Sequence, residues 1–394
     1  MSEASSSTST ATTTDGPAKP VGRLRQLDGL RGVAAVVVMF SHLSVIVPEI
    51  AGPYFGQPRG EVGSLEWWVS HTPLKLFTLG VESVFVFFIL SGLVVSLPAF
   101  ANPSWSWKSF YPRRIVRLYV PTLAALLFAY ALALYARNPA DVGSVWLQMQ
   151  AGGPSVREAL RDATVVAGGF RLDNPLWSIR WEVIFSLTLP IFTIAAVIFR
   201  KIWLLPIVAL AALVIAGVSF QIDLLAYPAM FALGVVMASQ LARLRAVAEA
   251  ISRNRFGGVV WTALLAASVV SLMLYWLVWP ATSTGGEPVH LMLRGLGGVG
   301  AVVLVFVVCF WQRLTPFFTT RFVQWLGKIS FSLYLVHVPI LVTLAFALHA
   351  LPMWLVIVMS ALLSLVVAQL FFLIVERPSH KLSGVVGRRF APRA

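Results

Sequence analysis

Two histidines and one acid lie deep inside apolar stretches of the sequence. If those stretches are membrane helices, His42, Glu82 and His337 each stand roughly 12 to 16 Å from the polar end of their helix. An ionisable group at that depth is costly, so it calls for a partner or a function. A carboxylate can orient an imidazole by accepting its N–H, as in catalytic dyads. We therefore predict His42 and Glu82 as catalytic residues, with a protonated, merely hydrogen-bonded Glu82 as the alternative.

Arg31 and His42 share one face of the first apolar stretch. They are 11 residues apart, which leaves about 20° between them at about 100° per residue. Such a face can hold an anionic ligand at its rim and react with it near its centre. The alternative is an arginine that orients the helix in the membrane and a histidine that bonds to a neighbouring helix.

A second basic group, Arg113, Arg114 and Arg117, lies within five residues of chain. On a helix Arg114 and Arg117 point the same way, and a pair of guanidinium groups fits phosphate. Basic clusters beside a membrane also anchor helices and contact lipid headgroups. Spacing alone leaves both interpretations open.

Two further segments combine polar and aromatic residues. Trp177, Ser178 and Glu182 begin an apolar stretch, where Glu182 can pair with Arg180 or hold a polar acceptor. In a later stretch, Tyr334 and His337 follow Ser330 and Ser332 within three helical turns. Such side chains either bond neighbouring helices or line a site. We predict a substrate-binding set from these segments: Trp177, Ser178, Glu182, Tyr334 and His337.

Composition places these residues in a membrane protein. Of the 394 residues, 58% are hydrophobic and 12% are charged, about half the charged fraction of a soluble domain. This argues against a water-soluble enzyme, a disordered chain and a nucleic-acid binder, despite a net charge of +14. The single cysteine, Cys309, excludes an internal disulfide and a four-cysteine metal site. We predict no metal and no tightly bound cofactor.

Apolar stretches long enough to cross a bilayer recur along the chain. The fold class is therefore all-α, a polytopic integral membrane protein with about ten transmembrane helices. We expect them at 32–50, 74–100, 119–136, 176–198, 202–219, 225–241, 257–279, 291–311, 326–348 and 353–375.

Basic residues in the polar breaks predict the orientation. With the N-terminus inside, about three quarters of the 30 lysines and arginines face the cytoplasm, so both termini are expected there. We divide the chain into a disordered tail at 1–22, a transmembrane domain at 23–378 and a basic tail at 379–394. The expected location is the plasma (inner) membrane. The longest outer break, 137–175, contains an amphipathic segment.

In their order and separation these motifs resemble the membrane acyltransferase-3 family, over nearly the whole chain beyond the tail. Arg31 with His42 is similar to the family motif on the first helix. The remaining similar segments are Gly80-Val81-Glu82 through Ser91-Gly92, Arg114 with Arg117, Leu176-Trp177-Ser178 with Glu182, and Ser332-Leu333-Tyr334-Leu335 with His337.

The resemblance implies an O-acyltransferase, in the first instance an O-acetyltransferase. The acyl group would come from cytoplasmic acyl-CoA, with acetyl-CoA as the expected co-substrate, and go to a hydroxyl of a glycan, glycolipid or secondary metabolite. His42 would act as base or acyl relay, with Glu82 orienting it. The resemblance implies that the CoA phosphates are held by Arg31, Arg113, Arg114 and Arg117.

The rival interpretation is a proton-coupled secondary transporter or flippase. In it, His42, Glu82 and His337 would form a proton relay. The sequence shows neither an inverted repeat nor interrupted helices in matching halves, features that are typical of such transporters. We therefore favour the enzyme.

Overall fold

The computed structural model describes residues 24–55, 57, 59–102, 105–135, 137–279 and 288–391, and within these ranges it contains helices and no strand. Eight helices in this part of the chain are long and apolar enough to cross a membrane. They are α1 (Arg25–Ser44), α4 (Gly80–Ala101), α5 (Trp107–Ala133), α8 (Leu176–Ile198), α12 (Gly257–Val278), α13 (Pro288–Phe310), α15 (Arg321–Ala347) and α16 (Met353–Phe371). The predicted all-helical membrane fold is confirmed.

Two of the ten predicted segments form shorter helices. These are α9 (Leu204–Ser219) and α10 (Asp223–Ser239). A sharp bend of 77° separates α10 from α11 (Leu241–Arg253), so the pair is either one broken span or a re-entrant element. All ten predicted apolar segments are therefore helical, although two of them are short.

The C-terminal segment predicted as a basic tail differs from that prediction. After α16, the backbone passes through a π-turn, Phe372–Glu376, into α17 (Arg377–Arg389). Much of the segment predicted as a basic tail is thus a helix, which packs against α5. The N-terminal tail predicted at 1–22 lies outside the described residues.

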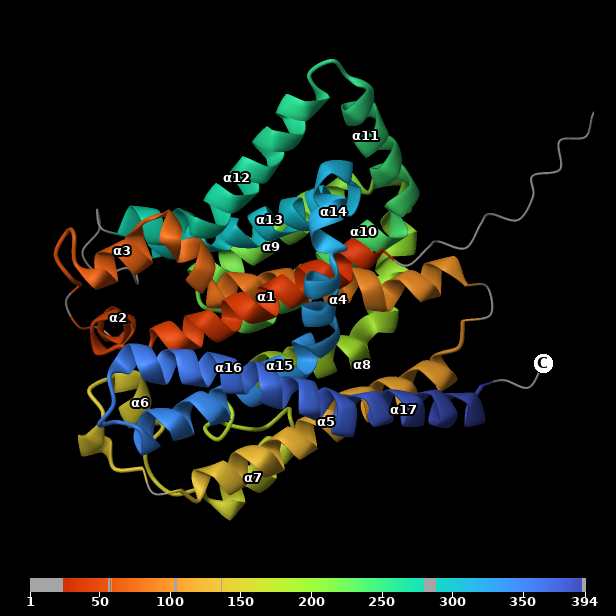
Figure 1. Ribbon diagram of the computed structural model, residues 1–394. Coiled ribbons are helices and arrows are strands. Elements are labelled where there is room, and N and C mark those ends of the chain that lie inside the picture. Colours follow the sequence, from red (N-terminus) through yellow and green to blue (C-terminus); the bar gives the residue numbers. More distant parts are fainter. Residues whose placement is uncertain are drawn as a thin grey trace, which may run out of the picture.

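Short helices build the two loops predicted to be external. The first contains α2 (Pro48–Ala51), α3 (Leu65–His71) and the 3₁₀ turn Pro73–Thr78, and the second contains α6 (Val145–Met149) and α7 (Val156–Ala163). Serine side chains cap α3, α6 and α7 by accepting from backbone N–H groups of the first turn. All of these short helices except α7 gather at one end of the bundle (Figure 1).

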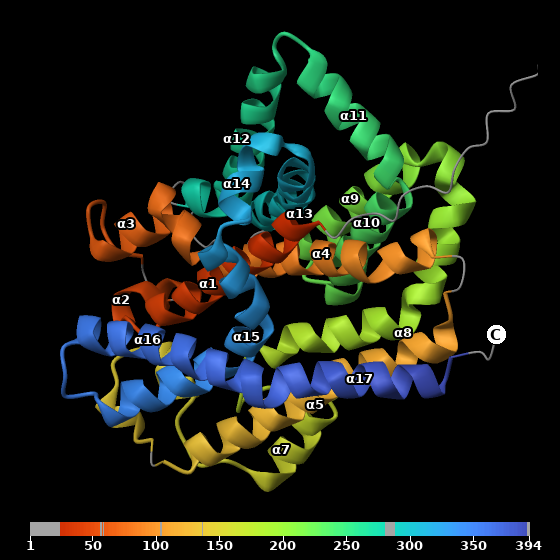
Figure 2. The ribbon, with the colours of Figure 1, turned by 45° about the vertical axis from the view of Figure 1, so that its right-hand side comes forward.

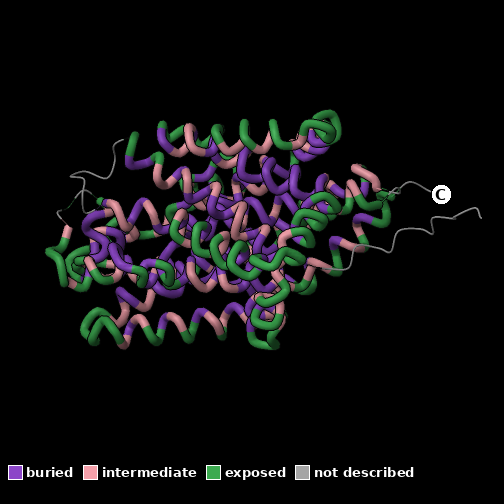
Figure 3. Tube along the Cα trace, turned by 90° about the horizontal axis from the view of Figure 1, so that it is seen from above, coloured by how far each residue is buried: buried purple, intermediate pink, exposed green. Residues whose placement is uncertain are grey.

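The helices pack around α1, α4 and α15. Helix α1 packs on α15 and α4, and α4 packs on α10. Figure 2 shows α11 and α12 rising from this bundle as a hairpin. Buried backbone lies in the middle of the molecule, and the outer helices expose one side (Figure 3). Exposed residues on these outer faces include Ile191, Val208 and Leu362, which is the apolar surface that lipid requires.

Paired glycines bring the central helices into close contact. A Cβ at Gly32 of α1 would collide with the backbone of Gly327 on α15, and one at Gly327 would collide with Asp28. Gly92 on α4 and Gly234 on α10 make the same kind of contact. Small residues allow such close approach of membrane helices, so these glycines set the positions of the side chains around them.

Candidate active site

A cavity of about 450 Å³ lies among α1, α4, α5, α8, α15 and α17. Its basic wall unites residues from two helices, Arg31 of α1 with Arg113, Arg114 and Arg117 of α5. The structure therefore brings together the four arginines that the sequence analysis grouped. Ser178 and Tyr334 line the same cavity.

His42 and His337 form a hydrogen-bonded pair. Nε2 of His337 lies 3.1 Å from Nδ1 of His42. Nδ1 of His337 lies 2.8 Å from the carbonyl oxygen of Leu333, and Nδ1 of His42 lies 3.1 Å from that of Val38. His337 is fully buried. Residues 295 positions apart in sequence thus meet at one point between α1 and α15.

These contacts determine where the protons of the two neutral rings lie. A carbonyl oxygen only accepts, so Nδ1 of His337 carries a proton and its Nε2 is an acceptor. Nδ1 of His42 then donates to His337 and Val38, which leaves the lone pair of His42 on Nε2. A histidine in that tautomer can take a proton from an incoming hydroxyl.

Asn174 is a site residue that the sequence analysis missed. Its side chain hydrogen-bonds to His42. Asn174 belongs to the turn before α8, where helical periodicity gives no signal; its place directly before Pro175 and the Leu-Trp-Ser motif was the available clue.

The orienting role predicted for Glu82 is wrong. Its Oε1 accepts from Nε1 of Trp276 at 3.3 Å and from Nε of Arg294 at 3.2 Å. In the hydrogen bonds of the described residues, His337 and Val38 take the place beside His42 that Glu82 was expected to take. A carboxylate buried at 2% exposure needs a charged partner, and Arg294 is that partner.

Glu82 belongs to a polar network below the first outer loop. Nζ of Lys75 donates to the hydroxyl of Tyr54 at 2.6 Å and lies 3.7 Å from the centre of the Trp276 ring. Burial of Lys75 lowers the pKa of its amine to about 7. Trp276 therefore links the lysine of the loop to the Glu82–Arg294 pair inside the bundle.

Glu182 faces the cavity, not an outer loop. It forms an ion pair with Arg114 and accepts from Oγ of Ser91 at 2.5 Å. Nε of Arg114 donates to Oγ of Ser186 at 2.9 Å. Arg180, the expected partner of Glu182, instead donates to the carbonyl of Gly168. Two residues of α8 thus hold Arg114 in place, and its guanidinium already has partners within the protein.

Ser178 and Tyr334 join α8 to the middle of α15. Their hydroxyl oxygens lie 2.7 Å apart, and the Tyr334 hydroxyl also donates to the carbonyl of Pro175 at 3.3 Å. The Tyr334 and His337 rings are 6.1 Å apart. Helix α8 therefore starts at the depth of the histidine pair. This corrects the expectation that the motif lies at the outer rim.

Trp177 has a packing role in the structure. Its ring contacts Phe88 at 6.3 Å and Tyr227 at 5.4 Å between ring centres. It is absent from the residues that line the 450 Å³ cavity. The substrate-binding role predicted for Trp177 therefore has no support from the geometry of this cavity.

The π-turn after α16 directs Glu376 into the basic wall. Its Oε2 accepts from Oγ of Ser332 at 2.6 Å, and its charge interacts with Arg31 and Arg117. Glu376 is 4% exposed. A π-turn changes the direction of side chains along a helix and is frequent at functional sites. Glu376 thus lies beside two arginines of the basic wall.

Asp173 is a buried acid in the turn before α8. It is fully buried, and neither carboxyl oxygen has a hydrogen-bond partner among the described residues. Burial raises the pKa of Asp173 well above its usual range. Burial therefore disfavours the charged form of this acid.

Comparison with known proteins identifies the family of this chain. The acyltransferase domain family matches residues 24–373. The acyltransferase MdmB of Streptomyces mycarofaciens is 29% identical over 186 residues, which is 46% of this chain and 43% of that protein. The chain thus matches less than half the length of this relative. No solved structure matches.

Proposed function

Because the chain belongs to the acyltransferase-3 family and is a multi-pass membrane acyltransferase, we propose that it transfers an acyl group from cytoplasmic acyl-CoA to a hydroxyl. The acyl group is acetyl in the first instance. The acceptor is a glycan, a glycolipid or a secondary metabolite, and the enzyme works in the plasma membrane. The hydrogen bond between His42 and His337 carries this proposal.

The basic wall supports a phosphorylated donor. Arg31, Arg113 and Arg117 line one cavity, and the Arg114–Glu182 pair stiffens it. Guanidinium groups fit the diphosphate and the 3′-phosphate of CoA. The pantetheine arm then runs along α1 toward Tyr334 and His42, with its thioester beside the histidine pair.

The tautomer of His42 supports its role as general base. Nε2 takes the proton of the acceptor hydroxyl, and the oxygen bonds to the thioester carbonyl carbon. The carbon–sulfur bond then breaks, and the proton passes from His42 to the sulfur of CoA. While His42 is protonated, its Nδ1–H bond to Nε2 of His337 becomes stronger, because it is then charge-assisted. Transient acylation of Nε2 is the alternative route.

Replacement of His42 tests the proposal. We expect His42→Ala to lower acyl-CoA-dependent O-acylation by about 10²- to 10⁴-fold, measured as free CoA release and acylated product in membranes. His349→Ala is the matched control, because His349 bonds locally to the carbonyl of Phe346 near the end of α15. Full acylation by a well-expressed His42→Ala protein would overturn the role of His42.

The rival transporter proposal is weakened. Its proton relay needs Glu82 to communicate with the two histidines, but Glu82 accepts from Trp276 and Arg294. Proton-driven uptake into liposomes without any turnover of acyl-CoA would revive it. Release of free CoA by the purified protein would favour the enzyme.

A further inference from the structure

A second cavity of about 920 Å³ adjoins the basic wall. It lies between α1, α4, α15 and the turn from α16 to α17, and the proposed reaction does not use it. Arg31, Arg117, Glu376 and His380 line both cavities, so the two spaces share one wall. A single elongated ligand can therefore occupy both.

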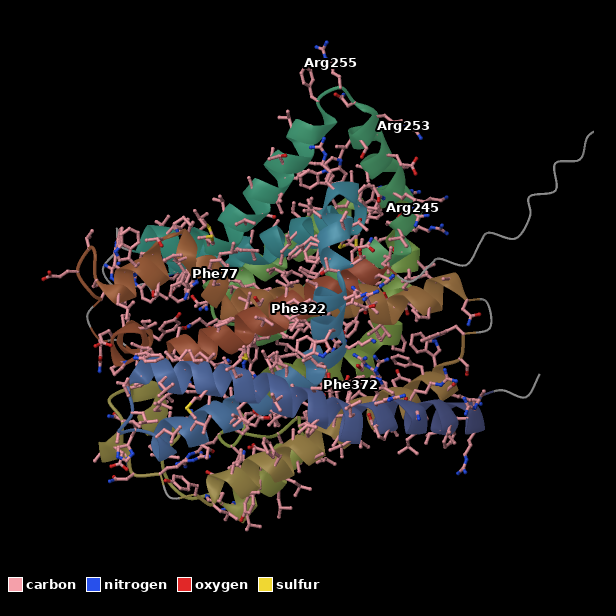
Figure 4. All side chains as sticks on the ribbon, viewed as in Figure 1. Phe77, Arg245, Arg253, Arg255, Phe322 and Phe372 are labelled. Carbon is pink, nitrogen blue, oxygen red and sulfur yellow. The ribbon has the colours of Figure 1, made fainter. Side chains whose placement is uncertain are left out.

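Trp325 gives the second cavity a fixed aromatic side chain. Its Nε1 donates to Oε1 of Gln369 at 2.7 Å. The ring of Phe322 packs against it at 5.7 Å between centres. Both Trp325 and Gln369 line the cavity. Figure 4 labels Phe322 on α15 and Phe372 at the turn after α16, the two elements that enclose this space. The indole is thus held in place before any ligand arrives.

The charge of this cavity favours an anion. Four cationic side chains and two acids line it, an excess of two positive charges when His380 is neutral: Arg31, Arg117, Lys328 and Arg377 against Asp28 and Glu376. A fixed indole beside grouped cations fits a flat base that carries phosphate groups.

We propose that the second cavity binds the adenosine 3′-phosphate end of the acyl-CoA donor. Trp325 stacks on the adenine, and Lys328 and Arg377 contact phosphate. Arg31 and Arg117, in the shared wall, hold the diphosphate, and the pantetheine arm passes into the first cavity toward Tyr334. This inference rests on the proposed function, because it takes acyl-CoA as the donor.

A comparison of acetyl-CoA with acetyl-pantetheine tests the second cavity separately from the first. Acetyl-pantetheine lacks the nucleotide and would therefore occupy only the first cavity. With purified full-length enzyme, Trp325→Ala should lower the ratio of kcat/KM for acetyl-CoA to that for acetyl-pantetheine by about tenfold, the usual effect of losing one aromatic stack on a base. Trp325→Phe should recover much of the ratio. Trp354→Ala is the control, because Trp354 is 66% exposed on the outer face of α16 and should leave the ratio unchanged.

The phosphate contacts have their own test. Lys328→Ala should weaken inhibition by adenosine 3′,5′-bisphosphate and reduce the preference for acetyl-CoA over its 3′-dephospho form. If Trp325→Ala leaves the ratio of kcat/KM for the two donors unchanged, even with an equal loss for both, the nucleotide site is overturned. Turnover of acetyl-CoA by the wild type would still support the proposed function in that case. Wild-type protein that turns over neither donor would overturn both.

Discussion

His42 can act as a base only if its lone pair is on the free nitrogen. His337 and the carbonyl of Val38 both face Nδ1, so the proton is held there. His337 is in turn fixed by the carbonyl of Leu333. This chain of bonds orients the imidazole of His42, the proposed base, with neutral partners in the place where many enzymes use a carboxylate.

We therefore propose that His337 positions His42 and does not bind substrate as predicted, and variants of His337 test this. His337→Ala should lower kcat by about a hundredfold and leave the KM for acyl-CoA near that of the wild type, because only the orientation of the base is lost. His337→Gln should recover about tenfold, because its amide oxygen can accept from Nδ1 of His42. Steady-state kinetics on both variants measure this. A raised KM with normal kcat would indicate substrate contact instead.

Lys75 should make stability depend on pH. Its amine has a pKa of about 7 in the folded protein, against about 10.4 in an unfolded chain. Between these values the unfolded state binds a proton that the folded state lacks, so stability rises with pH in this window. Below pH 7 the folded protein bears the full cost of burying an ammonium group.

Lys75→Met lacks this titration. The thermal midpoint of the wild type in detergent should rise relative to the variant between pH 7 and pH 9, at one scan rate. A constant difference between the two proteins would show that Lys75 keeps an ordinary pKa.

Spacing along one helix predicted some site residues and could not predict others. Arg31 and His42 share a helix, so their common face follows from helical geometry alone. The bond from His42 to His337, and that from Glu82 to Arg294, join different helices. Such partners depend on how helices pack, which one sequence does not reveal. Depth in the membrane singled out two histidines that the structure brings together, and it paired Glu82 with a histidine where the structure pairs it with Arg294.

At the scale of elements, contact between α1 and α15 holds the histidine pair. Gly32 and Gly327 let the two backbones touch, and no side chain there can move aside. Arg31 and His42 on one helix thereby face Tyr334 and His337 on the other. The close crossing of the helices is thus a requirement of the site.

Gly32→Ala should therefore be costly. The added methyl group would collide with the backbone of Gly327 and Leu326, and overpacking of this kind costs about 1 to 3 kcal/mol. We expect a lower thermal midpoint and a loss of O-acylation. Gly258→Ala is the control, because its new Cβ would meet only the Arg313 side chain at 3.9 Å. Equal behaviour of the two variants would argue against a close-packed crossing.

Hydropathy predicted which segments are helical better than it predicted where those helices end or bend. All ten apolar segments are helical, since apolar length alone defines a candidate span. The π-turn at Phe372–Glu376 and the bend between α10 and α11 leave no comparable pattern. The start of α8 beside Tyr334 was missed for the same reason, because an apolar run does not show how deep in the bundle a helix begins.

At the scale of the whole molecule, the distribution of charge sets the orientation. Arg245, Arg253 and Arg255 project from α11 and the turn before α12, away from the bundle (Figure 4). Basic residues concentrate on the cytoplasmic side of membrane proteins. We therefore expect the turn between α11 and α12 on the cytoplasmic side and the loop with α6 and α7 on the outer side.

Cysteine labelling tests this orientation. The sole native cysteine, Cys309, is 5% exposed, so background labelling should be low. A membrane-impermeant maleimide should label Gly153→Cys in intact cells, and Asn254→Cys only after the membrane is permeabilised. Both positions are exposed. The reverse pattern would place the termini outside and would require the donor to approach from the other side.

The short helices α9 and α10 affect the lipid around the protein. With 16 and 17 residues, they reach about 24 to 26 Å at 1.5 Å per residue, less than the roughly 30 Å of hydrocarbon in a typical bilayer. Most of α10 is buried within the bundle, so the lipid beside α9 must thin, or residues that flank α9 must reach toward the headgroups. Helix α10 packs on α4 and α8, which line the candidate site. A locally thinner bilayer there would shorten the distance between aqueous compartments and make acyl transfer sensitive to lipid chain length.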